Sequence, residues 1–231
     1  MLPVLVACSH GTASPDGQRA VGELVAAVAA RRPDLDVRAA FVDVQQPGPD
    51  AVLDDLAGRP ARLVPLLLSA GYHVFVDLQR AASRRPQVTV APALGPDPRL
   101  AELLCARLAS AGAAPGDAIV LAAAGSSEPS AVRDCAVMAT TLGRRLGAPV
   151  TAAYLSAARP RLTEAVAALR NQPWPAGREA RVVVATYLLA PGYFADLAAA
   201  AGADLVSLPL LVPGEAVPPG LTDIVLERYL S

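Results

Sequence analysis

Residues 6–12 read VACSHGT, an apolar run that ends in a histidine and a glycine turn. Residues 120–126, VLAAAGS, repeat this pattern without the histidine. Farther along each half, residues 67–73 (LLSAGYH) correspond to residues 188–194 (LLAPGYF). An accidental succession of helices and strands would not place the glycines and the tyrosine alike. The chain is therefore expected to be a duplicated unit.

Around these stretches, short apolar runs alternate with segments of helical composition. Continuous apolar strands separated by helices are typical of parallel sheets covered on both faces. We predict an α/β fold of two similar halves, each a parallel four-stranded sheet flanked by helices, with a cleft between them. The predicted strands are 2–7, 37–42, 62–68, 88–92, 118–123, 150–154, 181–187 and 205–208. The predicted helices are 15–31, 49–57, 74–84, 97–111, 130–146, 161–170, 193–201 and 219–230.

The boundary between the halves is expected in the small-residue segment 112–116, which reads GAAPG. A chain of 231 residues suits one large domain or two of ordinary size. We divide it into an N-terminal half, 1–113, and a C-terminal half, 114–231. The only two histidines lie in the first half, and the matching positions of the second half are Ala124 and Phe194. We therefore expect one functional site, in the first half, and loss of the corresponding site in the second half.

Composition excludes several classes of function. A net charge of −1 provides no basic field for nucleic acid or an anionic membrane. The chain has no lysine, which excludes lysine Schiff-base chemistry and a P-loop lysine. The N-terminus lacks the basic region of a signal peptide, and no apolar run reaches the roughly 18 residues of a membrane span. A cytoplasmic protein is expected.

The three cysteines, at positions 8, 105 and 135, are widely spaced and form no CxxC pair. Neither a zinc knuckle nor a disulfide framework is indicated. We expect three small buried residues in a reducing compartment.

His10 and His73 each follow an apolar run and adjoin a glycine turn. In an open parallel sheet, ligands bind beyond the carboxyl ends of the strands, so the two imidazoles are expected to converge. Neutral imidazole binds divalent transition metals and accepts protons near neutral pH. The other interpretation is that both histidines are turn residues whose nitrogens bond to backbone groups.

Asp43 ends the second predicted strand and is expected at the same rim. A carboxylate there could ligate a metal or receive a proton, although an ordinary turn aspartate explains it equally well. Asp77 could orient the imidazole of His73 or simply face solvent. A cluster of arginines on the same predicted helix could steer an acidic substrate or form a solvated helix end; its members are Arg80, Arg84 and Arg85.

The turns beside the two histidines also offer free backbone N–H groups. Those at the start of a helix could accept carboxylates or phosphates. The candidate ligand-binding residues are therefore Gly11 and Thr12 in the first turn, and Gly71 and Tyr72 in the second. The turns match neither a full P-loop nor a GxGxxG fingerprint, so nucleotide binding is weakly supported.

Three segments resemble the CbiX/SirB-type sirohydrochlorin chelatases, which are class II tetrapyrrole chelatases. They are residues 5–12 (LVACSHGT), 41–47 (FVDVQQP) and 64–77 (VPLLLSAGYHVFVD). The family pattern is a His-Gly-Ser/Thr turn, an acidic strand end followed by proline, and a Pro-hydrophobic-Gly-x-His-x-x-x-Asp segment. Long members of this family carry two chelatase-like halves, so the resemblance spans nearly the whole chain.

The resemblance implies insertion of Fe²⁺ or Co²⁺ into sirohydrochlorin, on the way to siroheme or cobalamin. His10 and His73 would be the metal-binding and proton-accepting residues of one active centre. Asp43 stands where the family usually has glutamate, and its side chain is shorter than glutamate by one methylene group. No tightly bound cofactor is implied, because the metal is a substrate. A monomer of two pseudo-symmetric halves is expected.

Other functions remain open at this point. Within enzymes, the metal could be nickel or the ring a porphyrin. Outside enzymes, the chain could be a non-catalytic metal or tetrapyrrole carrier, since the second half has lost its histidines. A two-lobed protein like the periplasmic binding proteins is a third alternative, which the absence of a signal peptide disfavours. Catalytic turnover would separate the enzyme from a carrier.

Overall fold

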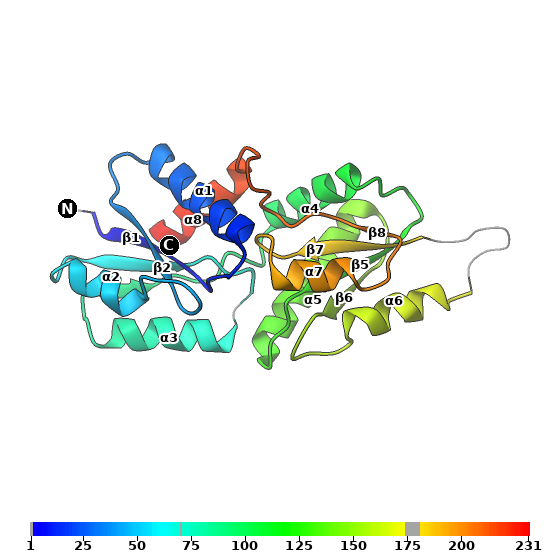
Figure 1. Ribbon diagram of the computed structural model, residues 1–231, viewed down its shortest axis with the longest axis horizontal. Helices are drawn as coiled ribbons and strands as arrows, with labels where there is room; N and C mark the ends of the chain where they lie inside the picture. Colours follow the sequence, from blue (N-terminus) through cyan, green and yellow to red (C-terminus); the bar gives the residue numbers. More distant parts are fainter. Residues whose placement is uncertain (1, 70, 174–180) are drawn as a thin grey trace.

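The computed structural model describes residues 2–69, 71–173 and 181–231, with the side chains of residues 72–75 excepted. It contains two four-stranded parallel sheets, one in each lobe (Figure 1). The first has the order β2-β1-β3-β4 and the second β6-β5-β7-β8. The strands are β1 Val4–Ser9, β2 Val37–Phe41, β3 Ala61–Pro65, β4 Val88–Val90, β5 Ala118–Ala123, β6 Val150–Tyr154, β7 Val182–Tyr187 and β8 Leu205–Val206.

A helix follows each strand. The helices are α1 Pro15–Arg31, α2 Pro49–Asp55, α3 Tyr72–Ser83, α4 Pro98–Ser110, α5 Pro129–Leu146, α6 Leu162–Arg170, α7 Tyr193–Ala199 and α8 Pro219–Leu230. Prolines occupy the first turns of α1, α2, α4, α5 and α8, where the missing N–H costs little. The predicted duplicated α/β fold with two parallel sheets is confirmed.

Strand β1 is buried on both faces, as a continuous apolar run predicts. Its alternate residues enter different cores because side chains along a strand point to opposite faces. Leu5 and Ala7 join a large core that also contains residues of the second sheet. Val4, Val6 and Cys8 join a smaller core with α2 and α3. A third core lies between the second sheet, α6 and α7. The large core is thus continuous between the lobes.

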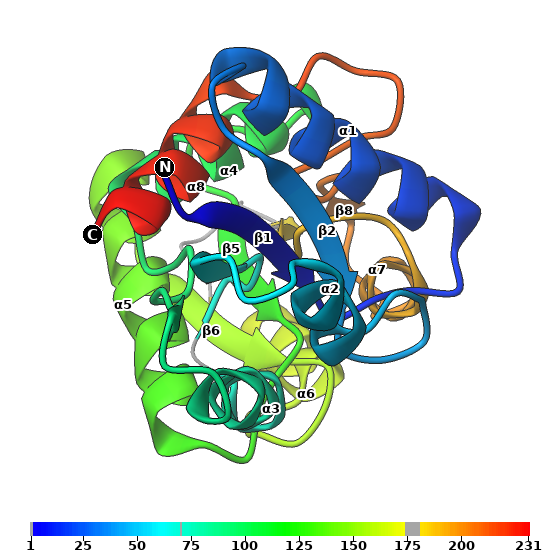
Figure 2. The same ribbon diagram turned by 90° about the vertical axis from the view of Figure 1, so that its left-hand side faces the viewer.

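The helix that closes each repeat packs on the other lobe. Helix α4, which follows β4, contacts α5 and β7 of the second lobe, whereas α8, which follows β8, contacts α1 and β3 of the first. Figure 1 shows α8 beside α1 in the left-hand lobe and α4 above β7 in the right-hand lobe. In Figure 2, α1 and α8 cover one face of the first sheet, and α2 and α3 cover the other. Each lobe therefore contains one helix of the other repeat, and the division at residues 113/114 stays a prediction from the sequence.

An ion-pair network joins the two exchanged helices. Asp97, at the N-cap of α4, is buried and accepts hydrogen bonds from the backbone and guanidinium of Arg99. Arg99 also pairs with Glu227 of α8, at 2.6 Å. From α8, Arg228 lies 3.6 Å from Asp97 and donates to the carbonyls of Ala93 and Leu94. The network holds α4 and α8 together where the chain crosses between lobes.

Some element boundaries differ from the sequence prediction. The first strand begins at Val4 rather than Leu2, because Pro3 has no N–H to join the ladder. Strand β3 ends at Pro65, not at residue 68, and the residues after it leave the sheet to line the space between the lobes. Helix α3 begins at Tyr72, two residues before its predicted start, so the backbone of His73 lies in its first turn.

Each helix in the described residues is either too short or too polar to cross a membrane. The cysteines are free. Cys8 and Cys135 are buried, as expected, whereas Cys105 is only half-buried.

Truncating the buried face of α8 is expected to destabilise the fold. Leu221, which is 1% exposed, lies in the shared core, and Leu221→Ala should lower the free energy of unfolding by about 2–5 kcal/mol. Leu230→Ala, a matched change on the same helix at a 66% exposed position, should alter it by less than about 0.5 kcal/mol. Urea unfolding of both variants measures the difference. Equal effects would contradict the packing of α8 described above.

The buried carboxylate at the helix crossing should make stability depend on pH. Burial by itself raises the pKa of Asp97, but the hydrogen bonds from Arg99 outweigh it, so the pKa lies below its ordinary value. Asp97 therefore stabilises the fold above its unfolded pKa of about 3.9, and this contribution is lost as pH falls through the lower folded pKa.

Asp97→Asn should accordingly cost about 1–3 kcal/mol at neutral pH. Its deficit relative to wild type should shrink as the pH drops below about 4. Urea unfolding between pH 7 and pH 3 tests this. Asp16→Asn, which breaks an exposed pair with Arg19, is the control and should have little effect at any pH. A constant deficit for Asp97→Asn would show that its charge is not responsible.

Candidate active site

A cavity of about 690 Å³ lies between the lobes, where the carboxyl ends of both sheets meet. Its lining includes Ser9 at the end of β1 and Leu66 after β3, and Ala123 and Leu188 at the corresponding places of the second lobe. This is where ligands bind in open parallel sheets. The volume falls in the range of small-molecule sites, about 300–1,000 Å³.

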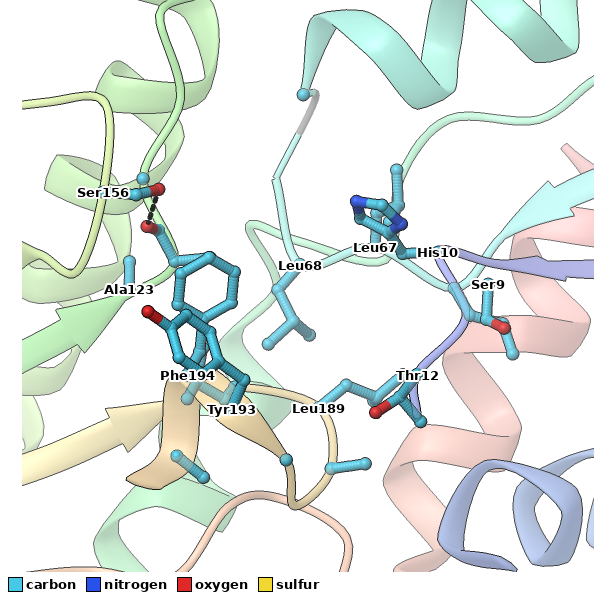
Figure 3. A pocket seen from close by; sticks show the side chains of 18 of the residues that line it. Ser9, His10, Thr12, Leu67, Leu68, Ala123, Ser156, Leu189, Tyr193 and Phe194 are labelled. Carbon is cyan, nitrogen blue, oxygen red and sulfur yellow. Dashed lines mark hydrogen bonds between the residues drawn. The ribbon is translucent and has the colours of Figure 1, made fainter. Parts of the chain in front are cut away.

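His10 lines the cavity on the side of the first lobe, directly after β1 (Figure 3). The turn that carries it rests on the backbone of Asp43, whose N–H donates to the His10 carbonyl at 2.9 Å. Gly11 has a φ of +93°, and a Cβ there would lie 2.0 Å from the carbonyl oxygen of Asp43. Only glycine fits this close approach, so the glycine after His10 is required by the turn.

The facing turn is strained. Val44 has a φ of +62°, and the N–H of Gln45 donates to the carbonyl of Asp43 at 2.6 Å, which closes a γ-turn. A β-branched residue rarely adopts this conformation, and such strain gathers at functional sites. The Gln45 side chain accepts a hydrogen bond from the N–H of Thr12 at 2.9 Å. The two turns at the cavity rim are thus braced against each other.

The predicted site residues are placed as follows. Gly11, Thr12 and Gly71 line the cavity with His10. Asp43 is exposed, and its carboxylate accepts from the N–H of Val44 at 2.8 Å, so in this structure it stabilises its own turn. The side chains of Tyr72 and His73 lie outside the described residues. Convergence of the two imidazoles and a role for Asp43 therefore stay predictions.

Three of the charged side chains expected near His73, namely Asp77, Arg80 and Arg85, have other contacts. Asp77 pairs with Arg80 at 2.8 Å. Arg85 pairs with both Asp50 and Asp54 of α2, so its charge is balanced on the outer side of the first lobe. None of Arg80, Arg84 and Arg85 lines the described cavity.

The two buried cysteines remain thiols at neutral pH. Burial raises the pKa of Cys135, which lines the cavity, to about 11, and it raises the pKa of Cys8 still further. The thiolate is the reactive form of cysteine, so burial keeps both residues in their less reactive thiol form. Among the described side chains, no three or more His, Cys, Asp or Glu residues are grouped to hold an ion. His10 is the described cavity residue suited to a transition metal.

The second lobe repeats the backbone conformation of the site but lacks its histidine. Gly125 has a φ of +95°, and a Cβ there would lie 2.0 Å from the carbonyl oxygen of Ser156. Ala157 has a φ of +52° between Ser156 and Ala158, which are joined by a hydrogen bond of 2.5 Å. Gly125, Ser156 and Ala157 match Gly11, Asp43 and Val44 of the first lobe. The position of His10 is held by Ala124, which also lines the cavity.

Sequence reasoning missed the aromatic wall opposite His10. Tyr193 and Phe194, at the start of α7, line the cavity with ring centroids 5.6 Å apart and a 53° tilt. In sequence, Phe194 is recognisable only as the residue that stands where the first half has His73. Its place in the repeat, matching His73, was the signal that could have shown that it faces the cavity.

A hydrogen bond between two residues that line the cavity joins the lobes. The hydroxyl of Tyr187, at the end of β7, donates to the carbonyl of Leu68 at 2.7 Å. Tyr187 is buried, and that burial raises the pKa of its phenol well above the ordinary value. The segment between β3 and α3 is thus tied to the second sheet by a neutral hydroxyl.

Comparisons with known proteins agree with this architecture. The CbiX family model matches residues 4–111 and 118–200, one match in each repeat. No curated protein sequence matches the chain. Among solved structures, SirB from Bacillus subtilis with Fe³⁺ superposes with a TM-score of 0.76 at 20% identity, covering 99% of this chain and 94% of that one.

Two further structures are similar. The sirohydrochlorin chelatase SirB from Bacillus subtilis subspecies spizizenii, in complex with cobalt, gives a TM-score of 0.73 at 17% identity and covers 100% of this chain and 94% of that one. The multi-domain protein DR2241 from Deinococcus radiodurans gives 0.64 at 20% identity, covering 99% of this chain but 54% of its own. At these identities the likeness establishes a shared fold.

The close approach at Gly11 leads to a prediction. Gly11→Ala should destabilise the protein by more than about 1 kcal/mol, because the positive φ and the Asp43 carbonyl leave no room for a Cβ. Gly22→Ala is the matched control. Gly22 lies within α1 with open space around it, so alanine there should stabilise by about 0.5–1 kcal/mol. Denaturant unfolding measures both, and stabilisation by Gly11→Ala would show that the turn is not constrained as described.

Proposed function

Because the chain belongs to the CbiX family, we propose that it is a sirohydrochlorin chelatase that inserts Fe²⁺ or Co²⁺ into the ring. The observation that carries the proposal is the cavity at the carboxyl ends of both sheets, with His10 on one wall. The two SirB structures of the same fold hold Fe³⁺ and cobalt, and one is named as a sirohydrochlorin chelatase.

The reaction exchanges two protons for one metal ion. A divalent cation enters the ring while two N–H protons leave it, so the site must present a loosely held metal and accept protons. Imidazole does both near neutral pH. We assign His10 and His73 as the residues that bind the substrate metal and receive protons. A cage of thiolates would hold the metal too tightly to release it, and the described residues contain no cluster of this kind.

The ring substrate carries many carboxylates, and backbone donors at the cavity rim are proposed to bind some of them. Gly11 precedes α1 and Tyr72 stands at the start of α3, whereas the N–H groups of Thr12 and Gly71 already donate to Gln45 Oε1 and to the Ser69 carbonyl, so a carboxylate would have to replace these partners. Carboxylates are favoured at helix N-termini by the free N–H groups and the helix dipole. Asp43 is proposed to act through the turn that braces His10, or as a proton acceptor when the ring is bound.

The remaining proposals follow from the sequence. The chelatase would work in the cytoplasm as a monomer, with halves 1–113 and 114–231 and a single active centre in the first. The alternative is a non-catalytic carrier of the metal or of the ring. This alternative is favoured by the second half, which has Ala124 and Phe194 where the first half has histidines. The two differ in turnover, because a carrier binds its ligand stoichiometrically.

The test is an anaerobic absorbance assay with purified protein, sirohydrochlorin and Fe²⁺ or Co²⁺. Wild type should complete many turnovers, and His10→Ala and His73→Ala should each lower kcat/KM by about 10²-fold or more, the usual range for removing an acid–base group. Leu230→Ala, on the exposed end of α8, should match wild type.

The outcomes separate the alternatives. Histidine variants as active as wild type would refute the assigned site. Binding of ring or metal without turnover would favour the carrier. The metal that reacts faster would indicate whether the enzyme serves siroheme or cobalamin synthesis.

A further inference from the structure

The two walls of the cavity differ in chemistry. Among the described side chains, the first-lobe wall carries His10, whereas the second-lobe wall has no histidine and combines small residues and three serines with the rings of Tyr193 and Phe194. The small residues are Ala123, Ala124, Gly125 and Ala157. In Figure 3, Tyr193 and Phe194 stand on one side, His10 on the other, and Leu68 and Leu189 lie between them. The duplicated backbone therefore supports two different surfaces.

The aromatic wall is poorly covered by the protein itself. Tyr193 is 72% exposed, and Phe194 is half-buried beside it. Exposed aromatic surface in a concave, largely apolar site is typical of ligand contact, because a bound ligand removes that surface from water. The tilt of 53° between the rings leaves them unable to cover each other by parallel stacking.

The small residues beside the rings have a structural consequence. Ala124 stands where the first lobe has the imidazole of His10, so the second-lobe wall is recessed by that side chain. Gly125 cannot carry a side chain, because a Cβ would lie 2.0 Å from the Ser156 carbonyl. A flat ligand can lie against these small residues, and the aromatic pair beside them offers π surface.

We infer that the second lobe is the ring-holding wall of the site, with Phe194 and Tyr193 packing against the conjugated macrocycle while the first lobe delivers the metal from the opposite face. The inference rests on the proposed function and extends it to residues outside the histidine site. Loss of the second histidine pair is then a gain of function for that lobe, since Phe194 replaces a metal-binding residue with a ring-binding one.

The deciding experiment compares ring binding with metal binding. Phe194→Leu keeps an apolar side chain and removes the π face, so the Kd for metal-free sirohydrochlorin, measured by fluorescence quenching, should rise about five- to tenfold. Tyr193→Leu should raise it in the same direction. Calorimetric binding of Co²⁺ without the ring should be unchanged in both variants, because His10 is untouched.

Turnover gives a second readout. In the chelatase assay, Phe194→Leu should raise the KM for sirohydrochlorin more than it lowers kcat, because the lost contact acts in binding the ring. Phe41→Leu is the matched control. It makes the same change in a half-buried phenylalanine of β2 that does not line the described cavity, and it should leave the ring Kd unchanged. Thermal unfolding checks that all variants fold.

Failure of this inference is distinct from failure of the proposed function. Wild-type turnover together with an unaltered ring Kd in Phe194→Leu and Tyr193→Leu would overturn the aromatic wall and leave the chelatase standing. Weaker Co²⁺ binding in the same variants would also overturn it, because the effect would not be specific to the ring. A wild type that neither binds nor metallates sirohydrochlorin would overturn both.

Discussion

Exchange of α4 and α8 places the hydrophobic face of each sheet in one core, and the shape of the cleft depends on that core. Residues of β1 and β3 share it with residues of β5 and β7. Opening the lobes widely would expose part of this surface, at a cost of about 25 cal/mol per Å² of apolar area. The Asp97–Arg99–Glu227 network adds a polar tie at the crossing. The two carboxyl edges are therefore held facing each other, and the space between them is a stable feature of the fold.

Duplication has produced two lobes with similar backbones, but the cavity walls that the two lobes form differ in their side chains. The glycines at 11 and 125 have nearly the same φ and the same close contact with a carbonyl. The turns at Val44 and Ala157 both have positive φ. Backbone geometry is preserved because the sheet ends and turns must still close. The side chains that line the cavity are free of that constraint, so His10 and Ala124 could diverge in function while the fold stayed the same.

The candidate site was predictable where it depends on local chain geometry. His10 follows a strand and adjoins a glycine, so its place at the edge of the sheet could be inferred from sequence alone. The strand before His73 was harder. The run from 62 to 68 looks like one strand, yet β3 ends at Pro65. The leucines after it line the cavity, and the carbonyl of Leu68 accepts a hydrogen bond from Tyr187 of the second lobe. Those contacts join residues more than 100 positions apart, which no local pattern reveals.

The sequence by itself determined the fold class, the duplication, the order of helices and strands, and the expectation that one half had lost its histidines. These properties are written in hydrophobic periodicity, turn residues and repetition, each of which acts within a few residues or within one repeat. Only the tertiary structure decided that α4 and α8 exchange lobes and that Phe194 and Tyr193 face His10 across a cavity. Helix packing and the meeting of two sheet edges depend on apolar surfaces distant in sequence, and many partners are equally hydrophobic. The choice among them is made by the packing of the whole molecule.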